Sequence, residues 1–179
     1  FAKFNLDYFH LNKKQFEDFF FYLFLAVIIG GRIGYILFYN INFYIDNPLD
    51  IFKVWEGGMS FHGALIGVIL TTFIFSKNYS IPLFLLSDLL SICAPVGIFF
   101  GRLSNFINQE LIGRQTNFII SINYPGEDIT RHISQIYEAI FEGLLPAIIL
   151  LIIFLKKKTK NGVLTSIFLI NYALARFLI

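Results

Sequence analysis

The chain has 179 residues, of which 56% are hydrophobic and only 15% are charged, whereas an ordinary soluble domain carries about 25% charged residues. A soluble core of this length cannot bury so much apolar surface, so the composition argues against a soluble, Phe-rich helical protein. The net charge of +2 and a single basic cluster, KKKTK at 156–160, give no reason to expect a nucleic-acid partner, and the lone Cys93 excludes an internal disulfide and a cysteine-cluster metal site.

Apolar runs in chain order predict five membrane-spanning helices. A span needs about 20 mostly apolar residues, and the runs cover about 18–40, 60–76, 83–101, 135–155 and 163–179. Their lengths suit helices better than the shorter alternating strands of a membrane barrel, although the second run is short and flanked by polar residues. The sequence therefore predicts an all-α, polytopic membrane protein in which residues 1–179 form a single membrane domain. We expect it to be part of a longer protein, because it opens without Met and stops inside an apolar run.

The distribution of lysine predicts the orientation of these helices. Five spans place alternate connections on opposite sides of the membrane. All lysines except Lys53 fall in one set of connections, 1–17, 77–82 and 156–162. Because lysine-rich connections stay on the cytoplasmic side, we expect the connections 41–58 and 103–134 to lie on the outer face.

The segment GRLSNFINQELIGR, residues 101–114, gathers polar groups where an apolar run ends. Arg102 offers a rigid fork of donors that suits a phosphate, and the amide of Asn105 can meet ester or glycerol oxygens. Glu110 can pair with an arginine or move a proton, while Gly101 and Gly113 allow tight backbone turns. The alternative is a polar network that only caps the helix end and turns the chain.

Further charges lie within or beside the apolar runs. Arg32, Arg102 and Arg176 are of this kind, and such residues normally face a polar interior and act on something. Tyr172 and Arg176 are spaced i, i+4 and share a helix face. Asp88 is a fourth embedded charge, and pairing with an arginine is one role that its position leaves open.

Proton transfer has few candidates on the expected outer side. His62 opens the second span, and histidine is the usual residue for proton transfer, although a lone histidine at a helix start is commonly structural. His132 is a further candidate, and Ser134 either caps the fourth span or belongs to a binding site. There is no Ser or Cys nucleophile with an evident base and no metal-site motif, so we expect no metal or cofactor and a nucleophile that arrives with the substrate.

Taken together, five ordered segments resemble the prolipoprotein diacylglyceryl transferase family of bacteria. They are GGRIGYILFYN (30–40), VWEGGMSFHGALIGV (54–68), GRLSNFINQELIGR (101–114), HISQIYE (132–138) and YALARFLI (172–179). The resemblance implies an enzyme of the cytoplasmic, or inner, membrane with its active site toward the periplasm. It moves the diacylglyceryl group of phosphatidylglycerol to the thiol of the lipobox cysteine in a prolipoprotein signal peptide, forming a thioether and releasing glycerol phosphate.

The resemblance also implies roles for individual residues. Arg102, Asn105, Gly113 and Arg176 match substrate-binding positions of the family, and the catalytic positions fall on His62, Arg102, Asn105, Glu110, Tyr172 and Arg176. The chain departs from the family pattern at Ser104, Ala64 and Ile133, where the family has Gly or Ala, Gly, and Pro. Two rival functions stay open: a transporter or channel for an anionic solute, and a phosphatidyltransferase, although the latter class normally shows a run of aspartates that this chain lacks.

Overall fold

The computed structural model describes residues 2–126, 128–156 and 159–179, and the chain divides into two units, Phe1–Leu86 and Ser87–Ile179. The predicted all-α membrane fold is confirmed. Within the described residues, the helices long and apolar enough to cross a membrane are α1 (Lys13–Tyr39), α3 (Phe61–Tyr79), α4 (Leu83–Ile107) and the helical stretch Ser134–Leu155. The fifth predicted span corresponds to α7 (Val163–Leu178), which is apolar but has only 16 residues.

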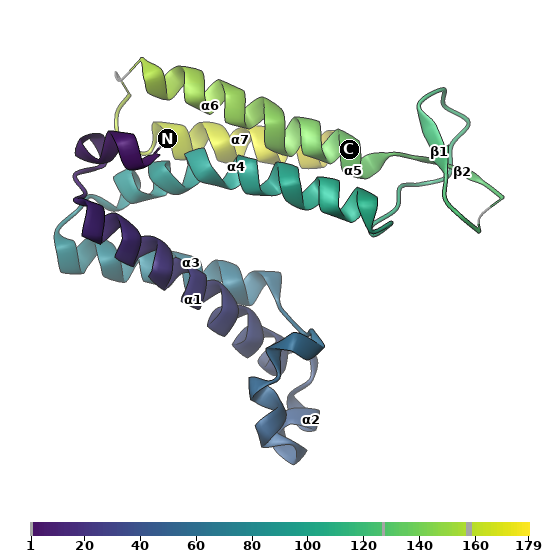
Figure 1. The fold of residues 1–179 in the computed structure, drawn as a ribbon, viewed down its shortest axis with the longest axis horizontal. Helices are drawn as coiled ribbons and strands as arrows, with labels where there is room; N and C mark the ends of the chain where they lie inside the picture. Colours follow the sequence, from purple (N-terminus) through teal and green to yellow (C-terminus); the bar gives the residue numbers. More distant parts are fainter. Residues whose placement is uncertain (1, 127, 157–158) are drawn as a thin grey trace. The chain divides into compact units, whose positions relative to one another are not determined.

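Shorter elements connect these helices (Figure 1). The first unit adds η1 (Ala2–Phe9), α2 (Ile41–Asp46), η2 (Pro48–Phe52) and η3 (Val54–Glu56). In the second unit β1 (Ser121–Asn123) and β2 (Thr130–His132) form an antiparallel hairpin, with Ser121 opposite His132. The stretch Ser134–Leu155 consists of α5 (Ser134–Glu138), the π-helical turn η4 (Ala139–Leu144) and α6 (Leu145–Leu155).

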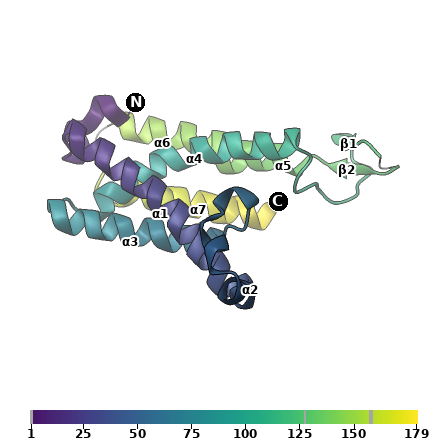
Figure 2. The same cartoon turned by 60° about the horizontal axis from the view of Figure 1, so that its bottom comes forward.

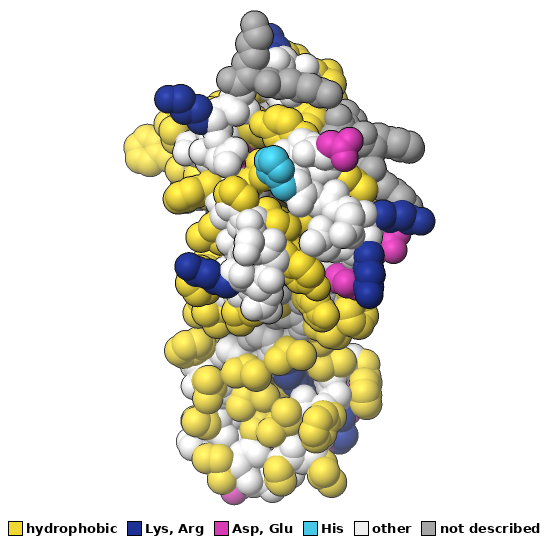
Figure 3. Space-filling model, turned by 90° about the vertical axis from the view of Figure 1, so that its left-hand side faces the viewer, with side chains coloured by type: hydrophobic (Ala, Val, Ile, Leu, Met, Phe, Trp, Pro, Cys, Tyr) yellow, Lys and Arg dark blue, Asp and Glu magenta, His cyan; other side chains and the backbone are white. Residues whose placement is uncertain are grey.

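The surface carries the apolar side chains that a bilayer requires. Phe24 on α1 is 62% exposed and Phe177 on α7 is 87% exposed, as are many other large hydrophobic side chains. Figure 3 shows this on one face, where hydrophobic side chains are widespread and charged side chains are few. Such a surface is costly in water and favourable against lipid, so it supports a multi-pass membrane protein.

Glycines bring α1 and α3 into backbone contact in the first unit. A Cβ built on Gly30 would stand 2.6 Å from the carbonyl oxygen of Gly63, and one on Gly63 would overlap the carbonyl oxygen of Gly30. One turn further along each helix, Gly34 and Gly67 make similarly close approaches to the partner helix, to Gly63 and Ala26 respectively. Small residues four apart are a common way for membrane helices to pack, because close approach strengthens van der Waals contact.

Hydrogen bonds to the carboxylate of Asp88 help to hold the second unit together. Its carboxylate accepts hydrogen bonds from the backbone N–H of Gly162 (2.7 Å), the backbone N–H of Thr165 (2.8 Å) and the hydroxyl of Thr165 (2.7 Å). Asp88 is fully buried, and it supplies the acceptor that α7 lacks at its own N-terminus. The suggestion that Asp88 pairs with an arginine is therefore wrong.

The Asp88 contacts place the start of α7 beside the first turns of α4, and the two helices run in the same direction. Figures 1 and 2 both show α4, α6 and α7 side by side, with the β1–β2 hairpin beyond the C-terminal end of α4. In this arrangement the C-terminal halves of α4 and α7 lie near the segments that carry the predicted site residues of this unit.

We expect Gly63→Ala to destabilise the packing of α1 on α3. The added methyl group would overlap the Gly30 carbonyl, and overpacking of this kind costs about 1–3 kcal/mol. The matched control is Gly101→Ala, since a Cβ there meets no atom within 4 Å among the described residues. Thermal unfolding in detergent should show a lower midpoint for Gly63→Ala alone, and equal midpoints would contradict the close contact.

Candidate active site

Helix α4 ends in a left-handed turn that sets the start of the polar segment. The backbone N–H of Glu110 donates to the carbonyl of Asn105 (2.8 Å), that of Gln109 donates to Phe106 (3.2 Å), and Gln109 has φ 57°. This pairing closes the helix C-terminus in the manner of a Schellman motif, which normally has glycine at the left-handed position. Gly101, predicted to allow a tight turn, lies inside α4 with open space around it, so that prediction was wrong.

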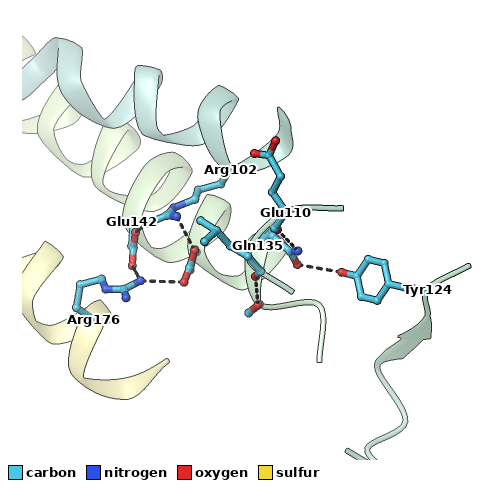
Figure 4. A network of polar contacts seen from close by, with 9 residues as sticks. Arg102, Glu110, Tyr124, Gln135, Glu142 and Arg176 are labelled. Carbon is cyan, nitrogen blue, oxygen red and sulfur yellow. Dashed lines mark hydrogen bonds and ion pairs between the residues drawn. The ribbon is translucent and has the colours of Figure 1, made fainter. Parts of the chain in front are cut away.

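Four charged side chains meet near this end of α4 (Figure 4). Arg102 contacts Glu138 through Nη1 (3.0 Å) and Glu142 through Nη2 (3.3 Å). Arg176 from α7 contacts the other oxygen of each carboxylate through its Nη1, at 2.8 Å from Glu138 and 3.0 Å from Glu142. The two glutamates thus bridge the two arginines. We call these four residues the charge cluster.

The π-helical turn η4 presents the glutamates to both arginines. A proline cannot donate an N–H to the preceding turn and clashes with it, so Pro146 disfavours a regular α-helix over the residues just before it. Gly143 lies in this turn, and a Cβ there would stand 2.7 Å from the Cα of Phe99. Glycine at 143 therefore permits close approach to α4, which brings fully buried Glu142 within reach of Arg102.

Gln135 forms a second polar network next to the charge cluster. It is fully buried, donates from Nε2 to the backbone carbonyl of Glu110 (2.7 Å) and accepts a hydrogen bond from the hydroxyl of Tyr124 (3.2 Å). The hydroxyl of Ser134 donates to the carbonyl of Leu111 (3.4 Å) and does not cap its own helix, which excludes the capping alternative. These bonds tie the loop after α4 to the start of α5.

Gly113 lets the same loop approach strand β2. A Cβ at this position would overlap the carbonyl oxygen of His132, and Nη1 of Arg131 donates to the Gly113 carbonyl at 3.2 Å. The structure therefore shows close contact between two chain segments at Gly113, and not the predicted tight turn. Its proposed contact with substrate stays a prediction.

A cleft of about 810 Å³ opens beside the charge cluster. Arg176 and Glu138 line it from the cluster, and the loop 111–114 lines it from the end of α4. Further apolar and polar lining residues are Phe141, Leu145, Leu174, Leu178, His132 and Asn171. An amphipathic ligand suits this lining, because apolar walls adjoin a guanidinium edge.

Arg102 and Arg176 are the predicted residues that the structure brings together. Among the described residues, the amide of Asn105 and the exposed carboxylate of Glu110 make no side-chain hydrogen bond, so their roles stay predictions. Tyr172 is half-buried one turn before Arg176, with its ring centroid 6.0 Å from that of Phe168.

Two other predicted residues lie in the first unit. His62 occupies the first turn of α3, where its ring is exposed, and its part in proton transfer stays a prediction. Arg32 is buried, and its guanidinium donates to five backbone carbonyl oxygens at 2.5–3.3 Å, those of Asp50, Ile51, Lys53, Gly57 and Gly58. All its donors are engaged, so Arg32 holds the chain between α2 and α3, and the expectation that it acts on a ligand is not supported.

Neither Glu142 nor Gln135 was among the predicted site residues. The pattern that identifies Glu142 is present in the sequence, because two carboxylates four residues apart in an apolar run can neutralise two arginines in other runs. Gln135 has no comparable pattern, since its two partners lie 11 and 25 residues away. Within the described residues, no group of three or more His, Cys, Asp or Glu side chains is placed to hold a metal ion.

Comparison with known proteins assigns the whole chain to one family. The family model for prolipoprotein diacylglyceryl transferase matches residues 2–179. Proteins named phosphatidylglycerol--prolipoprotein diacylglyceryl transferase are 46% identical in Rickettsia bellii and 48% identical in Ehrlichia canis, each over 172 residues and 94% of this chain. The relative in Ehrlichia ruminantium is 51% identical over 158 residues and 86% of the chain. The matched segments cover 65%, 66% and 61% of these relatives, so the chain spans just under two thirds of their length.

We expect Glu142→Gln to destabilise the second unit. The change removes a fully buried carboxylate that contacts both arginines, and breaking a buried ion pair costs about 3–5 kcal/mol; the partial exposure of Arg176 favours the lower end. Glu110→Gln is the matched control, because that side chain is exposed and unpaired among the described residues. Chemical denaturation in detergent should separate the two variants, and similar stabilities would argue against the charge cluster.

Proposed function

Because this chain belongs to the prolipoprotein diacylglyceryl transferase family, we propose that it transfers the diacylglyceryl group of phosphatidylglycerol to the lipobox cysteine of a prolipoprotein. The names of its relatives support this substrate pair. The observation that carries the proposal is that Arg102 and Arg176, from two different helices, share the same glutamates while Arg176 lines a cleft with apolar walls. A phospholipid has the matching chemistry, with an anionic phosphate attached to apolar chains.

Arg176 is the first contact that we propose for the lipid phosphate. It lines the cleft with a side chain that is 47% exposed, and its contacts with the glutamates among the described residues all use Nη1. Its Nε and Nη2 therefore remain as donors along one edge of the guanidinium, a geometry that suits two oxygens of one phosphate. Arg102 is more buried and uses both Nη atoms on the glutamates, so its role is to hold the carboxylates that orient Arg176 and to add positive charge.

The reaction makes the phosphate more negative. The sulfur of the lipobox cysteine forms a bond to the diacylglyceryl carbon, the bond from that carbon to the phosphate oxygen breaks, and the electron pair leaves with glycerol phosphate. A phosphodiester with one negative charge thus becomes a phosphate monoester that gains a second. Fixed donors aimed at developing charge lower the barrier substantially, and we assign this role to Arg176, with Arg102 as its support.

The thiol must lose its proton, because the thiolate is the attacking species. We retain His62 as the proposed acceptor, directly or through water, since histidine changes protonation near neutral pH. We assign Asn105 and Gly113 to binding of the head group, and Glu110 and Tyr172 to support of the reacting groups, as the family resemblance implies. The proposed location is the cytoplasmic membrane, with the cleft toward the outer side.

Loss of the guanidinium fork should abolish most of the transfer. In vesicles of phosphatidylglycerol, the complete protein should convert a lipobox peptide to its thioether and release glycerol phosphate. Arg176→Lys keeps the charge but removes the paired donors, so we expect a rate lower by about 100-fold or more. Arg114→Lys, in the same cleft, is the matched control. A near-normal rate for Arg176→Lys would contradict the fork, and anion flux without any change in the lipid would favour a transporter.

The proposed orientation predicts which connections are accessible from outside the cell. In a Cys93→Ser background, Asn123→Cys in strand β1 should react with a membrane-impermeant maleimide in intact spheroplasts. Asn161→Cys, in the lysine-rich connection before α7, should react only after the membrane is opened. Both native side chains are exposed in the structure, so access depends on the side of the membrane, and the reverse pattern of labelling would overturn the orientation.

A further inference from the structure

Two polar atoms in the cleft have no hydrogen-bond partner. Among the described residues, the buried side-chain atoms of this kind are Nδ1 of His132 and Oδ1 of Asn171. Both residues line the cleft beside Arg176. Buried polar groups in folded proteins are nearly always paired. A buried group without a partner therefore indicates a specific cause, such as a bound ligand or a functional role. Two exceptions that share one cleft indicate a polar ligand group that the protein itself does not supply.

The two residues enter the cleft from different parts of the second unit. His132 is the last residue of strand β2, where its backbone N–H donates to the Arg114 carbonyl (2.9 Å) and its carbonyl packs against Gly113. Asn171 lies on α7, one turn before Ala175 and Arg176, on the helix face that Leu174 and Leu178 share. Both residues therefore belong to the wall of the cleft that Arg176 also lines, and their unpaired atoms are buried within that wall.

A hydroxyl group is the chemistry that satisfies both atoms. Oδ1 of Asn171 accepts a hydrogen bond, and Nδ1 of His132 accepts in one neutral tautomer and donates in the other. A hydroxyl both donates and accepts, so it suits either tautomer. An ammonium group can only donate and would also be repelled by Arg176, and a carboxylate can only accept. A ligand with two hydroxyl groups beside a phosphate can pair with both residues while the phosphate contacts Arg176.

We propose that His132 and Asn171 are the specificity-determining residues that bind the terminal glycerol hydroxyl groups of the phospholipid donor. This inference rests on the proposed function, which supplies a donor with a phosphate and a glycerol head group. The phosphate lies at Arg176 and the glycerol points toward His132 and Asn171, away from the bond that breaks. A phospholipid without these hydroxyl groups leaves both polar atoms unpaired. A site that binds its substrate by hydrogen bonds discriminates in this way against an analogue that lacks the matching groups.

The test compares two donors that differ only in the head group. Phosphatidylglycerol and phosphatidylpropanol share the phosphate and the acyl chains, and the second lacks both terminal hydroxyl groups. We expect the complete protein to prefer phosphatidylglycerol by about 100-fold or more in kcat/KM. Asn171→Leu and His132→Phe should each reduce this preference about 10-fold or more, because each lowers transfer from phosphatidylglycerol and removes a polar atom that phosphatidylpropanol leaves unpaired.

Controls separate a specific effect from a damaged fold. Asn123→Leu makes the same chemical change at an exposed position in strand β1, and it should keep the wild-type preference. If Asn171→Leu or His132→Phe loses transfer from both donors, the proposal is tested by the thermal unfolding midpoint of that variant in the presence of each lipid. Equal stabilisation by the two lipids supports the proposal, and stronger stabilisation by phosphatidylglycerol overturns it.

Failure of this inference is distinguishable from failure of the proposed function. Variants that transfer the diacylglyceryl group and keep the full preference for phosphatidylglycerol contradict the roles of His132 and Asn171 alone. A wild-type protein that transfers from neither donor contradicts the proposed function. The lipid-dependent shift in thermal unfolding then still tests whether these two residues bind the glycerol hydroxyl groups.

Discussion

Charges inside an apolar environment must be compensated, and this constraint governs the second unit. An arginine at the centre of a membrane span costs about 2.5–3.5 kcal/mol on insertion scales, and Arg102 and Arg176 both lie in apolar helices. Glu138 and Glu142 reduce that cost because each carboxylate contacts both guanidinium groups. The same contacts connect the C-terminal halves of α4 and α7 through the turn between them. With the Asp88 cap at the helix starts, ionic or charge-assisted bonds hold this unit at both ends.

The charge cluster is formally neutral, which changes how it can recognise an anion. Two arginines and two glutamates sum to zero, so attraction by net charge is weak at this point, and recognition depends on the direction of the remaining donors. Arg176 has such donors at the cleft, whereas both Nη atoms of Arg102 contact carboxylates. The sequence does not distinguish these two arginines, whereas the proposed function gives Arg176 the contact with the ligand and Arg102 the support of that contact.

Arg32 illustrates how an embedded arginine can be entirely structural. Its five donors all reach backbone carbonyl oxygens, and its guanidinium also lies 5.1 Å from the centroid of the Tyr44 ring. No donor is left for a phosphate. Arg32 and Arg176 are both long cations in apolar helices, and they differ in how many of their guanidinium donors have partners within the protein. Counting the partners of each donor identifies Arg32 as structural, which its position in the sequence alone does not.

Composition and the lengths of apolar runs were enough to predict the helical membrane fold, and local motifs were enough to identify the family and most candidate site residues. These features depend on neighbouring residues, through burial of apolar surface and helix geometry. Tertiary structure alone decided that Asp88 caps α7, that Gln135 bridges Glu110 and Tyr124, and that His132 shares a cleft with Asn171. Each of these depends on which distant segments meet, and the choice among polar partners is settled by packing and the cost of leaving a buried donor or acceptor unpaired.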